Sequence, residues 1–321
     1  MNIAEIRMRI METLYVSKLI GREAELAARP GMVHAAADSP ERFEIVLEGM
    51  KRDSSGPPAA GQAMRHMVGS VLGINRSLRT VDKNPAEART QMPASELAEL
   101  EKFARSVGVD DMGYARLSET LVFRGKAVLH PNAIVLTMEM DKRRIDTSPS
   151  PESFVAVHET YHNLGDASNK IAAYLRQRGY SAHAGHPLGG LALYPPLAQQ
   201  AGLGWRGLHG LLITPRFGPR VRLAAVFTSI ENLPIDPDNA SEHQWIEDYC
   251  DLCRRCAREC PPQAFLKEPL EHDNGLISCV ETEKCFPYFF DYYGCSICIR
   301  VCPFQEHEYD KLKRHVVATS T

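Results

Sequence analysis

All nine cysteines of this chain lie between residues 250 and 302, and the 249 residues before them contain none. The first run, CDLCRRCARECP, has the spacing C-x2-C-x2-C-x3-C-P and begins at Cys250. The second run, CSICIRVCP, spans Cys295 to Cys302 and follows an isolated Cys285. An odd number of cysteines in a 321-residue chain does not suit a disulfide framework, which is typical of short secreted domains. The pattern therefore indicates metal binding.

The spacing of the first run is that of bacterial ferredoxins, in which three cysteines bind one [4Fe–4S] cluster and the fourth binds a neighbouring cluster. A short loop wraps three thiolates around one corner of a cubane, so the fourth ligand approaches from the far side and comes most easily from the other run. We therefore predict two [4Fe–4S] clusters. The ligands predicted for the first are Cys250, Cys253, Cys256 and Cys302. Those predicted for the second are Cys260, Cys285, Cys295 and Cys298.

Cys279 is left over, and we interpret it as a structural or free thiol or, alternatively, as a replacement for Cys285. A pair of zinc ribbons is the other interpretation of the module, but ribbons usually have CxxC pairs separated by a longer loop. Two clusters that exchange ligands lie close together and form a short electron path. We expect the residues before the module to hold the redox centre or the substrate that the electrons reach.

Hydrophobic periodicity predicts helices that alternate with strands before the module, which argues for an α/β layer. SELAELEKFARSVGV is an amphipathic helix, and Ser150 and Gly179 suit the two ends of a long helix over 151–178. A loop is expected at SSGPPAAG (54–61), a short helix within 62–95, and strands at 132–140, 208–215 and 221–230. We therefore divide the chain into a mainly helical region (1–95), an α/β core (96–240) and the cysteine module (241–321).

The composition, 44 % hydrophobic and 24 % charged, is ordinary for a soluble globular protein. No apolar run approaches the roughly 18 residues that a membrane span needs, and the N-terminal segment lacks the apolar core of a secretory signal. The net charge of −3 gives no general attraction to nucleic acid or to anionic membranes. We therefore expect a cytoplasmic protein without a membrane or nucleic-acid partner.

The segment QQAGLGWRGLHGLLITPRFGPRVRLAAVFTSIENLP (199–234), followed by the two cysteine runs, resembles cobalamin-dependent reductive dehalogenases and their relative epoxyqueuosine reductase. The segment EKCFPYF also resembles the dehalogenases and favours Cys285 as a ligand. The resemblance implies a nitroreductase-like α/β (α+β) core that binds cobalamin base-off, followed by a ferredoxin-like double [4Fe–4S] module. It further implies that electrons from a ferredoxin or flavodoxin pass through the clusters to the corrinoid, which reduces a small organic substrate.

The resemblance also suggests site residues in the core. It places a tyrosine that donates a proton at about Tyr161, and the nearest cation to the family's basic catalytic position, here Leu208, is Arg206. The residues predicted to contact cobalamin are Gly204, His209, Thr214 and Arg220. Arg216 and Arg222 are further cations that could meet the corrin or lie at solvated strand ends.

Two alternative functions follow from departures from the family pattern. An epoxyqueuosine reductase-like enzyme would act on tRNA, but the segment GHPLGGLALYPP (185–196) lacks the carboxylate that those reductases carry there. A non-catalytic protein for electron transfer or corrinoid handling would tolerate Leu208 in place of the basic residue.

The segment HETYHNLGD (158–166) contains HExxH, the motif of zinc proteases. The longer form of that motif places its third ligand at Ser168, which argues against zinc, as do the two cysteine runs. Tyr161 lies on the apolar stripe of its predicted helix, where a packed core tyrosine is the alternative to a proton donor. His158 and His162 flank this stripe and either line a substrate or corrin pocket or lie on the surface.

Overall fold

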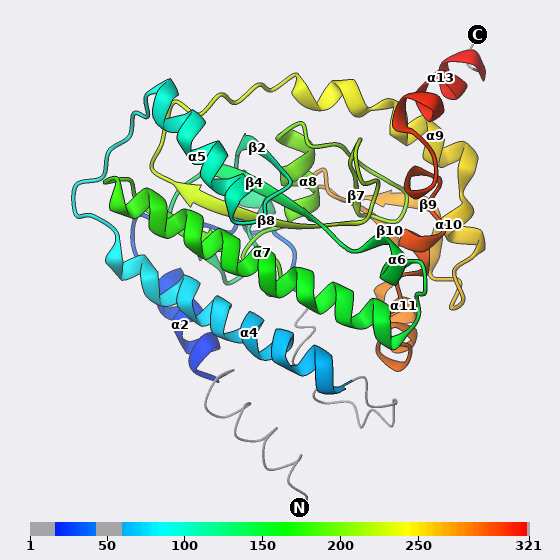
Figure 1. The fold of residues 1–321 in the computed structure, drawn as a ribbon, viewed down its shortest axis with the longest axis horizontal. Coiled ribbons are helices and arrows are strands. Elements are labelled where there is room, and N and C mark those ends of the chain that lie inside the picture. The colour runs from blue at the N-terminus through cyan, green and yellow to red at the C-terminus, as the bar shows by residue number, and fades with distance from the viewer. Residues whose placement is uncertain (1–16, 43–59, 320–321) are drawn as a thin grey trace, which may run out of the picture.

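The computed structural model describes residues 17–42 and 60–319, and its centre is a four-stranded antiparallel sheet (Figure 1). The strands, in the order in which they pair, are β2 (Asp111–Arg116), β4 (Asn132–Glu139), β8 (Val221–Thr228) and β5 (Ala182–Gly185). β4 and β8 pair over their full length, with Asn132 opposite Thr228 and Glu139 opposite Val221. The core is therefore a mixed helix-and-strand layer of the α+β kind, because its strands are antiparallel.

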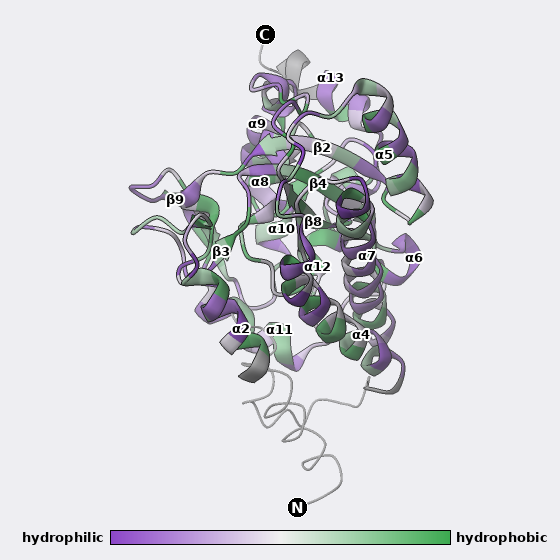
Figure 2. Cartoon of the chain, turned by 90° about the vertical axis from the view of Figure 1, so that its left-hand side faces the viewer, coloured by the Kyte–Doolittle hydropathy of each residue, from purple (hydrophilic) through white to green (hydrophobic). Residues whose placement is uncertain are grey.

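Helices cover both faces of this sheet, which explains why β4 is buried along almost its whole length (Figure 2). On one face, Ile134 and Leu136 pack against α5 (Ala94–Ser106) and α7 (Pro151–Gln177). On the other face, Ala133 and Val135 pack against α8 (Tyr194–Gln200). Successive side chains of a strand point to opposite faces, so one apolar run serves two hydrophobic clusters.

The long helix α7 has clear signals at both ends. Ser150 Oγ accepts a hydrogen bond from Ser153 N at 3.0 Å, and Ser153 Oγ accepts one from Ser150 N at 3.1 Å, which forms a capping box. Gly179 follows the helix with φ +83°, a left-handed conformation that favours glycine. The expected apolar stripe faces the sheet, where Leu164 and Ile171 are fully buried.

Helix α4 (Ala60–Arg79) lies along α7 in both views (Figures 1 and 2). Glycines at this contact leave room for histidine rings. A Cβ atom on Gly69 would overlap the ring of His162, and one on Gly165 would overlap the ring of His186. The ring of His186 is held in place because its Nδ1 accepts a hydrogen bond from Leu188 N at 3.1 Å.

The cysteine module is a set of short elements packed against the core. Its elements are α9 (Trp245–Cys253), α10 (Arg255–Arg258), β9 (Phe265–Glu271), β10 (Ile277–Val280), α11 (Thr282–Asp291), α12 (Ile297–Arg300) and α13 (Tyr309–Thr319). β9 and β10 form an antiparallel hairpin. Ile213 of the core packs in one hydrophobic cluster with Ile246, Cys302 and Phe304 of the module. The two regions therefore share buried surface.

The remaining elements are short. They are α2 (Ser17–Ala27), α6 (Lys142–Ile145) and the strand pairs β1 (Val33–His34) with β3 (Ala127–Val128) and β6 (Trp205–Arg206) with β7 (Leu212–Ile213). Within residues 17–42 and 60–319, none of the helices has the length and apolar character that crossing a membrane requires.

Most of the elements expected before the cysteine module are present within the described residues, with two differences. The strand expected over 208–215 is only Leu212–Ile213, because the preceding residues form the turn of a β6–β7 hairpin in which Gly207 N donates to Leu211 O at 3.0 Å. The helix expected to be short within 62–95 is the 20-residue α4. Most of the region expected to be helical before residue 55, and most of the loop expected at 54–61, lie outside the described residues.

The fit of α4 and α7 around histidine rings makes Gly165 sensitive to substitution. We expect Gly165→Ala to lower the free energy of unfolding by about 1–3 kcal/mol, because the new methyl group must displace the buried ring of His186. The matched control is Gly21→Ala in α2, where a Cβ atom meets nothing within 4 Å and a small gain in stability is expected. Thermal unfolding followed by circular dichroism compares the two, and an equal response would contradict this packing argument.

Candidate iron–sulfur and substrate site

The first predicted set of cysteines surrounds one cavity. Its lining includes all four predicted thiols together with residues of the core, and comprises Leu208, His209, Tyr249, Cys250, Cys253, Arg254, Arg255, Cys256, Cys302, Pro303 and Phe304. Cys302 thus joins the three cysteines of the other run. Four thiols around one space are an arrangement that suits a cluster.

Burial makes these thiols weak acids. It raises the pKa of Cys250 to about 12 and that of Cys256 to about 11, and it raises the pKa of Cys302 well above its usual value. Neighbouring thiols of the same set raise all three values further, since their negative charges would repel one another. A cluster replaces these protons with iron, so its assembly would release protons and relieve the repulsion.

The second predicted set is also brought together. Burial raises the pKa of Cys285 to about 11, and Cys260 and Cys295 are the neighbouring thiols that add to this shift. Burial also raises the pKa of Cys298, with contributions from those same residues and from Cys256 of the first set. The two sets are therefore adjacent, as expected of clusters that exchange ligands.

Cys279 lies apart from both sets. It is buried on β10, and burial raises the pKa of its thiol, while the nearby Arg206 lowers it. The neighbouring charges on Cys279 belong to Arg206, Asp251 and Glu247, and not to other cysteines. The geometry thus favours Cys285 over Cys279 as the fourth member of the second set.

The turn at residues 207–211 carries the core to the first set of thiols. Leu208 is buried in a cluster with Cys256, Ile297 and Val301. Next to it, His209 lines the thiol cavity and its Nδ1 accepts a hydrogen bond from Leu211 N at 3.2 Å. The Nε2 atom of His209 is buried without a partner, and burial lowers the pKa of the ring to about 4. A neutral imidazole with one free nitrogen therefore faces the cavity.

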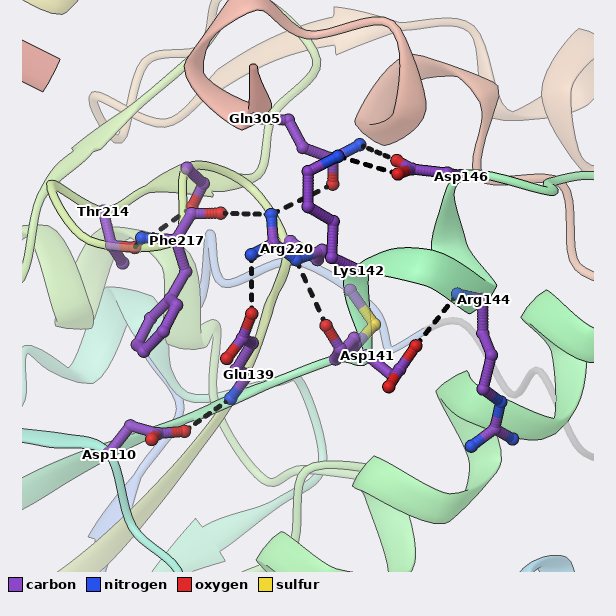
Figure 3. Close-up of polar contacts among 12 residues, drawn as sticks. Asp110, Glu139, Asp141, Lys142, Arg144, Asp146, Thr214, Phe217, Arg220 and Gln305 are labelled. Atoms are coloured by element: carbon purple, nitrogen blue, oxygen red, sulfur yellow. Dashed lines mark hydrogen bonds and ion pairs between the residues drawn. The ribbon is translucent and has the colours of Figure 1, made fainter. Parts of the chain in front are cut away.

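Arg220 joins the core to the module (Figure 3). Its guanidinium donates to the carbonyls of Met140 and Phe217, to Glu139 Oε1 at 2.6 Å and to Gln305 Oε1 at 3.3 Å. Gln305 in turn donates to Asp146 Oδ1 at 3.1 Å (Figure 3). The structure therefore gives Arg220, predicted as a cobalamin contact, a structural role close to Cys302.

Other parts of the chain contact three further predicted site residues: Gly204, Thr214 and Arg206. Gly204 has φ +149°, and a Cβ atom there would overlap the carbonyl of Ile213 across the β6–β7 hairpin, so the close backbone approach is made by the chain itself. Thr214 Oγ1 donates to Gly218 O at 3.1 Å and closes a turn. Arg206 donates to Ile277 O at 3.4 Å and lies beside Cys279. None of these contacts brings Arg206 to Tyr161.

Tyr161 is half-buried on α7, on the side of the helix that meets the module. It packs with Leu211 and Cys298 against a cluster formed by Met140, Ile145, Ala156, Val157 and Ile299. The guanidinium of Arg222, on β8, lies over its ring with Cζ 4.6 Å from the centroid. The phenol therefore lies beside a cation and near Cys298 of the second set.

The two histidines of the HExxH motif have different surroundings. His158 packs edge-on against Phe154, with ring centroids 4.3 Å apart, and burial lowers its pKa to about 4. His162 Nδ1 lies 3.3 Å from His66 Nδ1 of α4. Glu159 pairs instead with Arg144 at 2.6 Å. The motif therefore does not form a zinc site among the described residues.

The sequence analysis did not predict that Arg222 lies next to Tyr161. The pairing of Arg222 with Met138 across β8 and β4 sets the side of the sheet on which its side chain lies. That register depends on the alignment of two strands far apart in the sequence, so the pattern within VRLAAVF could not reveal the contact with Tyr161.

The mixed fold is that of reductive dehalogenases. A solved reductive dehalogenase structure, described as suggesting a mechanism for B12-dependent dehalogenation, superposes with a TM-score of 0.64 over 88 % of this chain and 42 % of that chain, at 21 % identity. At this identity the similarity concerns the fold.

Sequence relatives belong to the two families named above. The chain is 35 % identical to tetrachloroethene reductive dehalogenase of Desulfitobacterium hafniense over 229 residues, which is 65 % of this chain and 39 % of the relative. It is 33 % identical to epoxyqueuosine reductase of Listeria monocytogenes over 115 residues, 34 % of this chain and 28 % of the relative. Its homologues are thus reductive dehalogenases and epoxyqueuosine reductases, of whose length it spans well under half. No protein-family model matches the chain.

The two thiol sets predict the metal content of the protein. Anaerobically reconstituted protein should contain about eight iron and eight sulfide per chain, and Cys302→Ser should reduce both towards about four, because the first cluster loses a ligand. The matched control is Cys279→Ser, another buried cysteine, which should leave both near eight. Loss of iron in the Cys279 variant, or full occupancy in the Cys302 variant, would contradict this assignment.

Proposed function

We propose that the chain is a cobalamin- and iron–sulfur-dependent reductase, similar to reductive dehalogenases, that acts on a small organic substrate. The observation that carries this proposal is the grouping of eight cysteines into two adjacent sets that abut the core at Leu208 and near Tyr161. The dehalogenase relatives support a reductase, and their match covers more of this chain than that of epoxyqueuosine reductase.

We assign the following roles to residues of this chain. Each of the two adjacent thiol sets would hold one [4Fe–4S] cluster, and two neighbouring clusters would provide a path for single electrons. Bound cobalamin, base-off, would supply a low-potential cobalt centre able to reduce the substrate. His209 keeps a free ring nitrogen next to the first set and is the remaining polar candidate for contact with that cofactor, since Gly204, Thr214 and Arg220 are held by local contacts.

Tyr161 would hold the proton that the reduced substrate takes up. Arg222 lies over its ring and favours the negative charge that develops on the phenol as the proton leaves. Arg206 lies next to Cys279, whereas Arg222 lies over the ring of Tyr161. We therefore assign the role of the neighbouring cation to Arg222. The electron donor would be a ferredoxin or flavodoxin.

A second function is a non-catalytic carrier of electrons or corrinoid. It is favoured by Leu208, which takes the place of the family's basic residue and is buried among the cysteines. Such a protein would hold the clusters and have no need of the phenol at Tyr161.

Cobalamin binding separates these functions from simple electron transfer. We expect anaerobically reconstituted protein to bind about one cobalamin per chain, seen as a base-off absorption spectrum in addition to that of the clusters. A spectrum that shows clusters and no bound corrin, at full iron content, would contradict the proposed reductase and leave the electron carrier.

Substitution of Tyr161 tests the proton donor. We expect Tyr161→Phe to lower turnover by roughly 10²–10⁴-fold with cluster and cobalamin contents unchanged, because the proton is lost and the ring remains. Halide release from tetrachloroethene and from halogenated aromatic compounds, with a reduced viologen as donor, measures this. The matched control is Tyr174→Phe, on the same helix, whose ring also lies under a guanidinium, that of Arg178 at 3.5 Å. Equal activity of both variants would exclude Tyr161 as the acid.

A further inference from the structure

His209 carries a buried hydrogen-bond donor that has no acceptor among the described residues. Burial lowers the pKa of its ring to about 4, so the imidazole is neutral near pH 7. Its Nδ1 accepts a hydrogen bond from Leu211 N at 3.2 Å, so the ring proton lies on Nε2. This Nε2 atom is buried and unpartnered, although His209 lines the cavity enclosed by the first set of thiols. A buried donor left unpaired is costly, so the site favours an acceptor in that cavity.

The turn that carries His209 meets the thiols directly. The backbone amide of Leu208, the preceding residue, lies against Cys250 and stabilises its thiolate, although burial is the larger effect and raises the pKa of that thiol to about 12. Leu208 also packs with Cys256 in one hydrophobic cluster. The turn therefore places a main-chain donor on the first set of thiols, and the ring of the next residue adds a second donor that faces the same cavity.

We propose that Nε2–H of His209 donates a hydrogen bond to a sulfur of the cluster held by the first set, and thereby raises the reduction potential of that cluster. This inference rests on the clusters of the proposed function. Reduction adds negative charge to a cluster, whose sulfurs then accept hydrogen bonds more strongly, so a donor favours the reduced state. His209 would therefore help an electron to stay on the cluster that lies next to the core, where Leu208 packs against the cysteines.

Redox titration followed by electron paramagnetic resonance tests this hydrogen bond. His209 is also a candidate for contact with cobalamin, so the full chain is reconstituted with iron and sulfide alone. His209→Asn should weaken the preference of one cluster for its reduced state about tenfold, which lowers its potential by about 59 mV, and should leave the other cluster unchanged. Asparagine still offers an acceptor to Leu211 N but does not reach the position of Nε2. His209→Gln places an amide donor there and should recover at least about half of the shift.

The matched control is His183→Asn, because His183 is bonded in the same way as His209. Its Nδ1 accepts a hydrogen bond from Leu129 N at 3.3 Å, and its Nε2 is buried without a partner. Burial lowers the pKa of this ring to about 3, and the further contributions come from His130 and Arg176, not from cysteines. This variant should leave both potentials at their wild-type values.

The inference is overturned if His209→Asn leaves both potentials unchanged, if His209→Gln lowers the potential as far as His209→Asn does, or if His183→Asn causes the same shift. It is equally overturned if the shifted potential is the one that remains in Cys302→Ser, because that cluster belongs to the second set. Iron content and cobalamin binding are measured separately on the same preparations. The expected shift at full iron content without any binding of corrin would retain this inference and contradict the reductase, whereas bound corrin without the shift would do the opposite.

Discussion

The structure depends on the exchange of cysteines between two runs that are far apart in the sequence. Cys302 completes the set that begins at Cys250, and Cys260 joins the set around Cys285, so neither run can form its site alone. Burial raises the pKa values of Cys250 and Cys285, and repulsion from the anions of neighbouring thiols raises them further. Metal ligation would relieve this repulsion, because iron would replace the protons and supply positive charge. The proposed clusters would therefore also stabilise the fold of the module.

Contacts with the core determine the position of the cysteine module. The β6–β7 hairpin brings Leu208 and His209 to the first set of thiols, and Arg220, the residue before β8, reaches Gln305 just beyond Cys302. Two residues further along, β8 carries Arg222 to Tyr161. Residues at this spacing in an extended chain point to the same side, so this end of β8 serves both the interface with the module and the contact with Tyr161. A change in the register of β4 and β8 would disturb both at once.

The sequence predicts a structural feature well when the residues that determine that feature lie close together in the chain. The caps of α7, the apolar run of β4 and the cysteine spacing are local, and these elements and the grouping of the thiols are found where they were expected. The local contacts of Gly204, Thr214 and Arg220 depend on a hairpin and an interface formed by distant segments, so the sequence pattern did not reveal them, and the contact of these residues with cobalamin stays a prediction. The partnership of Arg222 and Tyr161 was missed for the same reason, since nothing in either segment indicates the other.

Leu208 stands where the family resemblance places a basic residue. The position of Arg222 over the ring of Tyr161 changes how this difference is interpreted. A buried leucine against the thiols supplies no cation at that turn, which by itself would favour a non-catalytic protein. Yet Tyr161 has a cation over its ring, supplied from a strand instead of the turn, and that cation has no carboxylate to neutralise it in residues 17–42 and 60–319. A protein that only relayed electrons would gain nothing from an uncompensated, partly buried charge, which lowers stability unless a ligand balances it. The position of Arg222 therefore supports the proposed role of Tyr161 more than it supports the non-catalytic carrier.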